Sequence, residues 1–115
     1  MPKSIVINKN GGPEVLELMD VKLNSPKPDE IKVTNHAIGL NYIDTYHRSG
    51  LYPLPLPSGI GLEASGKIDE VGSNVSEFNV GDNIAYASMP LGAYSQQRVI
   101  PAKIAVKIPN EISYK

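Results

Sequence analysis

The chain has 115 residues, 41% of them hydrophobic, with a formal net charge of −1 and no cysteine. This length suits one domain with a modest core, because a small chain buries a smaller share of its surface. Acids and bases are interspersed, which argues against nucleic acid and anionic membranes as partners. The absence of cysteine excludes a disulfide framework and a thiolate zinc site. With neither a signal-peptide core nor a membrane-length apolar run, we expect a soluble, cytoplasmic protein.

Short strands dominate the predicted elements. In chain order, seven segments have the β-branched or alternating apolar pattern of a strand: 4–8, 15–23, 30–38, 63–71, 83–87, 94–100 and 103–108. Asn35 interrupts the apolar face of the third segment, which predicts a bulge or an inward-facing, hydrogen-bonded amide. Short strands separated by Gly/Pro turns indicate a β-sandwich or a β-barrel.

The stretch from Ala37 to Gly66 departs from this strand pattern. Asn41 is suited to cap a short helix, with Asp44 at the third position of a capping box and a stop near Gly50. Three prolines between positions 53 and 57 then exclude a helix or a central strand. Because loops usually carry function while strands carry the scaffold, the candidate site is expected in this stretch.

The side chains of the predicted helix have ordinary structural interpretations. Asp44 and Arg48 stand four residues apart with the acid first, the spacing of a surface ion pair. His47 has no evident acid–base partner nearby, so we expect it on the helix surface. Tyr46 and Tyr52 suit partly buried rings whose hydroxyl groups reach water.

Three segments of the sequence resemble a known family. These are KNGGPEVLEL, AIGLNYIDTYHRSGLYPLPLPSGIGLEASG and VGDNIAYASMPLGAYSQQRVIPA, in this order. They are similar to the N-terminal part of the NADPH:quinone oxidoreductases, the zeta-crystallin-like branch of the medium-chain dehydrogenase/reductase superfamily. The resemblance runs from about Ile5 to Ile112. It implies a mainly β fold over residues 1–115, a GroES-like distorted barrel with one short helix, and hydride or electron transfer from NADPH to a quinone.

The resemblance also implies roles for individual residues. Asn41 and Tyr46 match positions beside the nicotinamide end of NADPH, and Tyr46 and Tyr52 match positions that line the quinone pocket. Zinc alcohol dehydrogenases of the superfamily have a cysteine and a histidine where this chain has Asn41 and Leu62, so no zinc is expected.

Three further residues are expected near the floor of the cleft. Glu63 is an acid in a glycine-rich, apolar surround, which favours a structural, hydrogen-bonded carboxylate there. Gly61 and Gly66 favour close backbone approach or unusual dihedral angles.

Family members continue into a Rossmann domain of on the order of 150 residues, whose glycine-rich turn and helix N-terminus hold the cofactor phosphates. This sequence lacks that fingerprint, because Gly59-Ile60-Gly61 precedes a strand and not a helix. We therefore expect the isolated chain to bind no NADPH and to be inactive. Its expected partners are a small-molecule quinone, the missing Rossmann domain and, through exposed apolar surface, further copies of itself.

Two alternatives remain open at the level of sequence. The chain is also compatible with a non-enzymatic β-barrel module for binding or oligomerisation. Enoyl reductases of the same superfamily share this domain, and tyrosines in a pocket do not distinguish a quinone from an enone.

Overall fold

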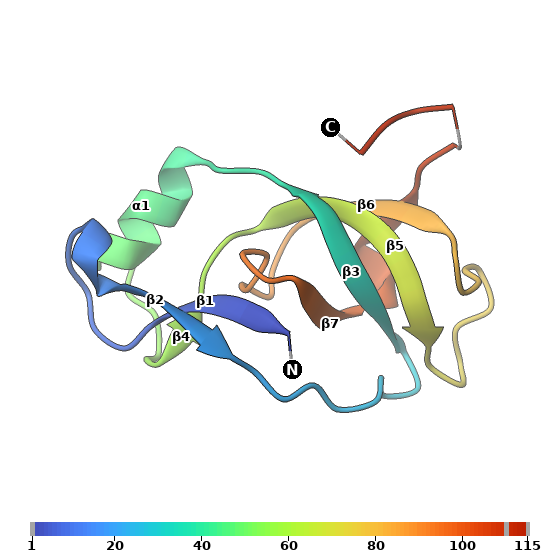
Figure 1. The fold of residues 1–115 in the computed structure, drawn as a ribbon, viewed down its shortest axis with the longest axis horizontal. Helices are drawn as coiled ribbons and strands as arrows, with labels where there is room; N and C mark the ends of the chain where they lie inside the picture. The colour runs from blue at the N-terminus through green and yellow to red at the C-terminus, as the bar shows by residue number, and fades with distance from the viewer. Residues whose placement is uncertain (1, 110, 115) are drawn as a thin grey trace.

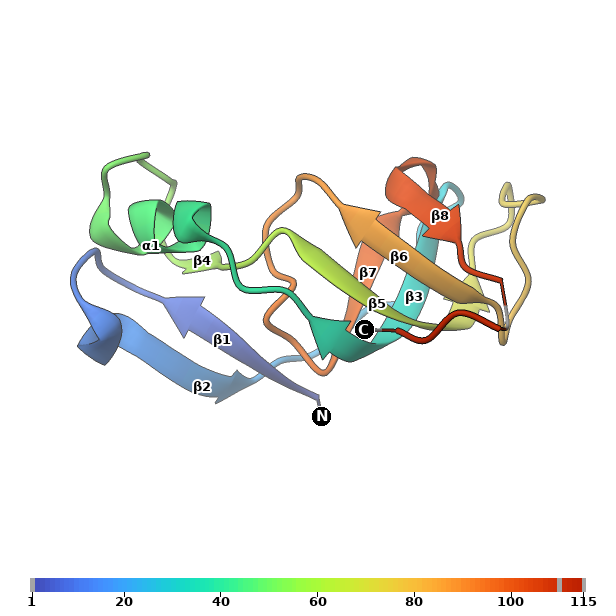
Figure 2. The same cartoon turned by 90° about the horizontal axis from the view of Figure 1, so that it is seen from above.

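The computed structural model describes residues 2–109 and 111–114, which form two antiparallel β-sheets and one α-helix (Figure 1). Seen from above, the smaller sheet and the helix occupy one end of the molecule and the larger sheet occupies the other (Figure 2). The predicted fold class, mainly β with one short helix, is confirmed. No helix in the described part of the chain is long and apolar enough to cross a membrane.

The smaller sheet has the strand order β2-β1-β4, and the larger has the order β7-β3-β5-β6-β8. The strands are β1 (Lys3–Ile7), β2 (Leu16–Asp20), β3 (Glu30–Ile38), β4 (Ser58–Gly59), β5 (Glu63–Val71), β6 (Asn83–Ala87), β7 (Gln97–Pro101) and β8 (Ala105–Lys107). Helix α1 covers Tyr42–Ser49, and 3₁₀ turns cover Pro13–Val15 and Ala102–Ile104. Because β7 and β8 are both edge strands, strand pairing among the described residues does not close the larger sheet into a barrel.

The first hairpin is shorter than predicted. The 15–23 segment begins within the 3₁₀ turn, where proline fixes the first dihedral angle, and strand β2 ends at Asp20. Asp20 pairs with Lys3, the first residue of β1, so residues beyond Asp20 have no strand left to pair with. Strand β4 arises from the proline-rich stretch, at the edge of the smaller sheet, and pairs through Ser58 and Gly59.

The last two strands also differ from their predicted bounds. The 94–100 segment joins the ladder with β3 only from Gln97, because the Tyr94 and Gln96 backbone N–H groups donate to Ile60 and Lys3. The 103–108 segment opens with the 3₁₀ turn at Ala102–Ile104 and is a strand only over Ala105–Lys107.

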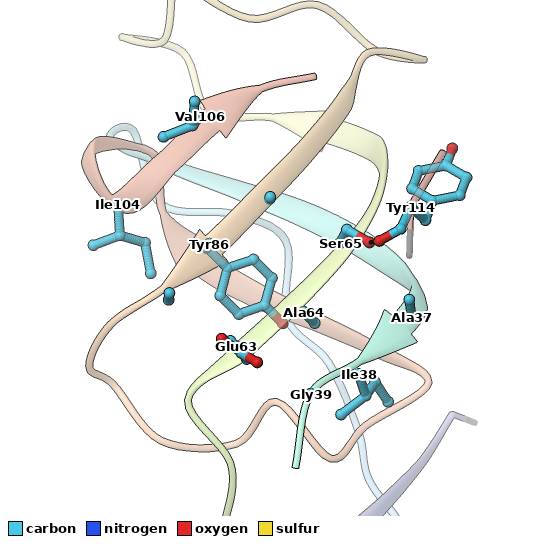
Figure 3. A pocket seen from close by; sticks show the side chains of 12 residues that line it. Ala37, Ile38, Gly39, Glu63, Ala64, Ser65, Tyr86, Ile104, Val106 and Tyr114 are labelled. Atoms are coloured by element: carbon cyan, nitrogen blue, oxygen red, sulfur yellow. Dashed lines mark hydrogen bonds between the residues drawn. The ribbon is translucent and has the colours of Figure 1, made fainter. Parts of the chain in front are cut away.

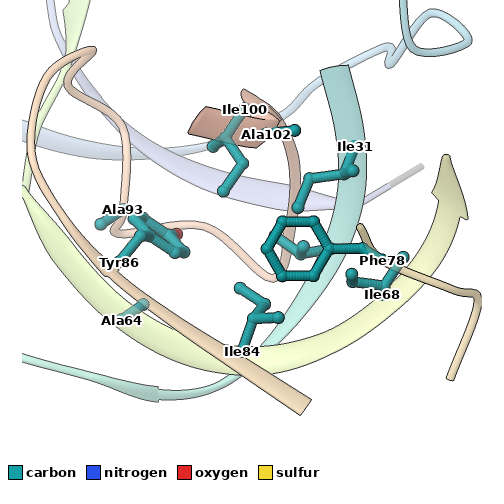
Figure 4. Close-up of a cluster of buried hydrophobic side chains, with 10 residues drawn as sticks. Ile31, Ala64, Ile68, Phe78, Ile84, Tyr86, Ala93, Ile100 and Ala102 are labelled. Carbon is teal, nitrogen blue, oxygen red and sulfur yellow. The ribbon is translucent and has the colours of Figure 1, made fainter. Parts of the chain in front are cut away.

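The core lies inside the curve of the larger sheet. The Phe78 ring lies among Ile31, Ile68 and Ile84 in this interior (Figure 4). Each such side chain contributes about 1.5–3 kcal/mol when fully buried. The full cluster comprises Ile31, Val33, Ala64, Ile68, Phe78, Ile84, Tyr86, Ala93, Ile100 and Ala102.

A polar group interrupts this apolar interior at Asn35, as the sequence predicted. Its Nδ2 donates to the carbonyl oxygens of Ala93 (3.2 Å) and Ser95 (2.9 Å), and its Oδ1 accepts from the Tyr86 hydroxyl (3.0 Å). The pairing of β3 with β5 shifts register directly after Asn35. Opposite, Gly66 leaves no room for a Cβ, which would overlap the Thr34 carbonyl oxygen. The bulge and the inward amide are therefore both present, and they shape the strand that leads to α1.

Candidate functional site

Helix α1 begins after Asn41 and ends before Gly50, the two residues that the sequence predicts as its cap and its stop. Asn41 is extended (φ −126°, ψ 155°), and its backbone N–H donates to Asp44 Oδ2 at 3.1 Å. Gly50 ends the helix in the left-handed region at φ 91°, with its N–H donating to the Tyr46 carbonyl oxygen (3.1 Å). The predicted cap and stop are confirmed, and they place Tyr46 on the last full turn and Tyr52 just beyond the helix.

The structure brings Tyr46 and Tyr52 into contact. Their ring centroids are 5.4 Å apart and the planes meet at 77°, an edge-to-face arrangement. The Tyr52 N–H donates to the Tyr46 carbonyl oxygen at 3.2 Å, which ties the loop to the helix. The two residues are 37% and 49% exposed, so ring faces and hydroxyl groups remain open to solvent.

Asp44 and Arg48 do not form the predicted surface pair. Asp44 is only 3% exposed, and its Oδ2 accepts from the Tyr94 hydroxyl. Arg48 turns the other way, where its Nε donates to the Gly11 carbonyl oxygen (3.2 Å) and its own carbonyl oxygen accepts from the Gly11 N–H (3.0 Å). Burial, and secondarily the hydrogen bond to Asp44, raises the pKa of the Tyr94 hydroxyl. Sequence reasoning missed Tyr94 because it lies fifty residues from Asp44.

His47 is buried, so its predicted surface position is wrong. It is 7% exposed, and its ring centroid lies 6.2 Å from that of Tyr52. Asp44 and His47 are three positions apart on the helix, which puts both on the face that packs against the rest of the chain. The Nδ1 atom is buried and has no hydrogen-bond partner among residues 2–109 and 111–114.

Glu63 and Gly61 lie where the chain enters β5. Gly61 has φ 98°, and an added Cβ would come within 2.5 Å of Tyr94 Cδ1. The Glu63 side chain packs against Gly39, where a Cβ would overlap its carboxylate. The predicted hydrogen bond to that carboxylate is absent among the described side chains, because apolar and small residues surround it in a groove of about 670 Å³.

This groove runs across β3, β5, β6 and β8 (Figure 3). Its lining includes Ile38, Ala64, Ile104 and Tyr114, with Glu63 as its charged member, and no residue of α1. The structure therefore places the predicted site residues in two regions. Asn41 lies at the start of α1 and the contacting pair Tyr46 and Tyr52 lies at its end, whereas Glu63 faces the groove.

The face at α1 is suited to flat aromatic ligands rather than to phosphates or metals. Exposed tyrosine rings stack on planar groups, and the contacting rings of Tyr46 and Tyr52 are both open to solvent. In the described part of the chain, no group of three or more His, Cys, Asp or Glu side chains is placed to hold a metal. Gly59-Ile60-Gly61 leads into β5 and so offers no helix N-terminus for a phosphate.

The chain is similar along nearly its whole length to part of several known reductases. A quinone oxidoreductase of Pseudomonas aeruginosa is 52% identical over 116 residues, covering 100% of this chain and 36% of that protein. The crystal structure of Escherichia coli quinone oxidoreductase complexed with NADPH has a TM-score of 0.95 at 49% identity, covering 97% of this chain and 35% of that chain. A 2-haloacrylate reductase of a Burkholderia species is 42% identical, covering 97% of this chain and 35% of that protein.

The chain thus spans about a third of the length of the curated relatives that it matches. The resemblance of its three segments to the N-terminal part of the quinone oxidoreductases is confirmed, and so is the GroES-like fold. The alcohol dehydrogenase GroES-like domain family matches residues 27–110. This match covers most of the chain, which therefore belongs to the family of alcohol dehydrogenase GroES-like domains.

Proposed function

We propose that this chain is the substrate-side domain of a zinc-independent, NADPH-dependent oxidoreductase that reduces a quinone. The observation that carries the proposal is the solvent-open, edge-to-face pair of Tyr46 and Tyr52. This pair occurs in a chain that matches quinone oxidoreductases along its whole length. When bound, NADPH supplies the hydride, and the residues of this chain orient the nicotinamide and the quinone relative to each other.

Each residue of this face has a distinct role in the proposal. Asn41 and Tyr46 flank the nicotinamide, and Tyr46 and Tyr52 shape the quinone pocket. The edge-to-face contact orders the two rings, and their exposed surfaces are available for stacking on a flat reactant. The two hydroxyl groups are available to hydrogen-bond a quinone oxygen.

The isolated chain is inactive in this proposal, because it offers no cradle for the cofactor phosphates. Its exposed apolar side chains near α1, which include Leu40, Tyr42 and Leu51, also favour self-association. In a longer protein, a nucleotide-binding domain would bind the phosphates and face this surface.

The proposal is tested with the isolated chain and with a chimera in which it replaces the matching N-terminal part of the Escherichia coli enzyme. NADPH binding is followed by nicotinamide fluorescence, and turnover by quinone-dependent oxidation of NADPH. We expect neither from the isolated chain, and turnover from the chimera. Turnover by the isolated chain would overturn its inactivity. A folded chimera that binds NADPH but reduces no quinone would contradict the proposal that the substrate is a quinone.

A second candidate is the reduction of an activated carbon–carbon double bond. The 42% identity to a 2-haloacrylate reductase favours it, since an acrylate carries such a bond. The tyrosine pair stacks equally well on a planar enone. Parallel assays of the chimera with a quinone, a 2-haloacrylate and a cyclic enone separate the two candidates, and faster turnover of the alkenes would favour the second.

A further inference from the structure

Tyr94 connects three segments that are far apart in the sequence. Its backbone N–H donates to the Ile60 carbonyl oxygen (3.0 Å), and its carbonyl oxygen accepts from the Ile5 N–H (2.8 Å). Its ring lies against Gly61, which has no Cβ to displace it. Its hydroxyl donates to Asp44 Oδ2 at 2.5 Å. The residue therefore joins β1 and the segment before β5 to helix α1.

Asp44 transmits this contact to the first turn of α1. The Oδ2 atom that accepts from Tyr94 also accepts from the Asn41 backbone N–H at 3.1 Å. One carboxylate oxygen thus accepts hydrogen bonds from both Tyr94 and Asn41, the residue that caps the helix. Asp44 is 3% exposed, and its Oδ1 is buried without a partner among the described residues, so it reaches a ligand only through the residues that it holds.

Helix α1 has a second attachment at its other end, between Arg48 and Gly11. That contact lies in the last turn of the helix and fixes it to the turn between β1 and β2. Loss of the Tyr94 contact would therefore leave the C-terminal end of the helix tethered at Gly11, while the nearest attachment before its first turn is the bond from the Gly39 N–H to the Glu63 carbonyl oxygen (3.1 Å). The first turn, which follows Asn41, would be free to move.

We infer that Tyr94 is a positioning residue of the proposed reaction: through Asp44, it fixes Asn41 and the first turn of α1 relative to the strands. The inference rests on the function proposed above and adds a residue that lies outside the exposed face. A displacement of about 1 Å near the reacting atoms can cost roughly a hundredfold in rate.

The variant Tyr94→Phe removes the hydroxyl and keeps the ring against Gly61. Tyr86→Phe is the matched control, because Tyr86 is also a tyrosine whose hydroxyl donates to a side chain, Asn35 Oδ1 at 3.0 Å. That bond lies within the larger sheet and not at α1. Each variant loses one hydrogen bond, so both lose stability, but only the first loses a constraint on the helix.

The first measurement is backbone amide hydrogen exchange by NMR on the 115-residue chain. The Asn41 amide donates to Asp44, so its protection reports the first turn of α1 directly. We expect Tyr94→Phe to lower this protection by roughly tenfold or more, and Tyr86→Phe to leave it unchanged. Unchanged Asn41 protection in Tyr94→Phe would overturn the inference.

The second measurement uses the chimera with the Escherichia coli enzyme, at temperatures well below the unfolding of every variant. We expect Tyr94→Phe to lower kcat by roughly ten- to a hundredfold, while the KM for NADPH stays close to that of the parent chimera. A structural role alone would lower the amount of folded enzyme but not kcat per folded molecule. An unchanged kcat would therefore overturn the inference.

Two further outcomes are informative. If Tyr94→Phe does not fold, Asp44→Asn takes its place, because it keeps the size of the side chain and weakens the hydrogen bond from Tyr94, since an ionised acceptor binds more strongly than a neutral one. We expect the same direction of change in both measurements, and no change would overturn the inference. If the parent chimera folds but reduces no quinone, the proposed function fails, while hydrogen exchange still decides whether Tyr94 positions α1.

Discussion

The guanidinium group of Arg98 lies over the ring of Tyr86, with Cζ 5.6 Å from the ring centroid. Arg98 is 7% exposed, and its Nη2 donates to the carbonyl oxygens of Pro90 and Leu91, both at 3.0 Å. Among the described residues, no carboxylate lies within ion-pair distance of it. Carbonyl oxygens and an aromatic face thus surround a buried cation whose Nη1 has no hydrogen-bond partner among the described residues. The Nη2 contacts tie Arg98 to the loop between β6 and β7.

We expect Arg98→Lys to lower the free energy of unfolding by about 2 kcal/mol. The planar fork of arginine donates to two carbonyl oxygens at once, and a lysine ammonium on a shorter, more flexible stem does not reproduce this geometry. Urea denaturation of both proteins measures the difference. Arg98→Met serves as the comparison, because it removes the buried charge and keeps an apolar stem. Equal free energies of unfolding for the lysine variant and the parent would contradict a stabilising role for the hydrogen bonds from Arg98 to Pro90 and Leu91.

Gly61→Ala and Gly81→Ala form a matched pair. Both glycines have positive φ (98° and 92°), so an alanine at either position costs about 1–2 kcal/mol for the left-handed backbone. At Gly61 the new methyl group would also meet the Tyr94 ring, whereas at Gly81 nothing lies within 4 Å. We expect Gly61→Ala to be the more destabilising by about 1–3 kcal/mol in thermal or denaturant unfolding. Equal losses of stability in the two variants would show that the Tyr94 ring moves away from the new methyl group at no cost.

The raised pKa of Tyr94 predicts a loss of stability at high pH. A tyrosine in the unfolded chain loses its proton near pH 10, whereas the folded chain retains the Tyr94 proton to higher pH. Above about pH 10 the unfolded state therefore binds fewer protons, and the free energy of unfolding falls as the pH rises. Below that pH the contribution is fully present.

Tyr94→Phe isolates this effect. The stability difference between the parent and Tyr94→Phe should be constant between about pH 7 and pH 9 and should shrink above about pH 10. Tyr42→Phe is the control, because Tyr42 is 83% exposed and its removal should give no such change. A difference for Tyr94→Phe that stays constant up to about pH 11 would contradict the prediction.

The exposed apolar side chains predict self-association of the isolated chain. Leu40 and Tyr42 are 79% and 83% exposed and adjoin the start of α1. We expect sedimentation to show concentration-dependent association, which Leu40→Lys weakens because a charge opposes burial of the surface. Leu18→Lys, at a residue that is 66% exposed on β2, is the control. A monomer at high concentration that binds no apolar dye would refute the prediction.

Features encoded by neighbouring residues were predictable from the sequence. The cap at Asn41 and the stop at Gly50 depend on groups within a few residues of each other, and the structure has both. Asn35 was recognisable as an interruption because a strand alternates its faces with a fixed period of two. The order of the strands required the resemblance of three long segments, since periodicity alone does not give pairing.

Features that depend on packing between distant segments were not predictable in this way. The buried face of α1 is chosen by the strands beneath it, so the burial of Asp44 and His47 is not visible in the helix sequence. The bond from Tyr94 to Asp44 joins residues fifty positions apart. For Glu63, the surrounding glycines indicated burial, but the groove supplies no donor to its carboxylate from the described residues.

The attachments of α1 through Tyr94 and through Gly11 bear on how related sequences can change the position of the helix. The aromatic face is carried by a helix whose ends are fixed to the loop that contains Tyr94 and to the turn that contains Gly11. Both fixing points lie on the scaffold side, away from the exposed rings. Changes in the length or residues of either loop would therefore shift the exposed rings relative to the strands while the rings themselves are inherited unaltered.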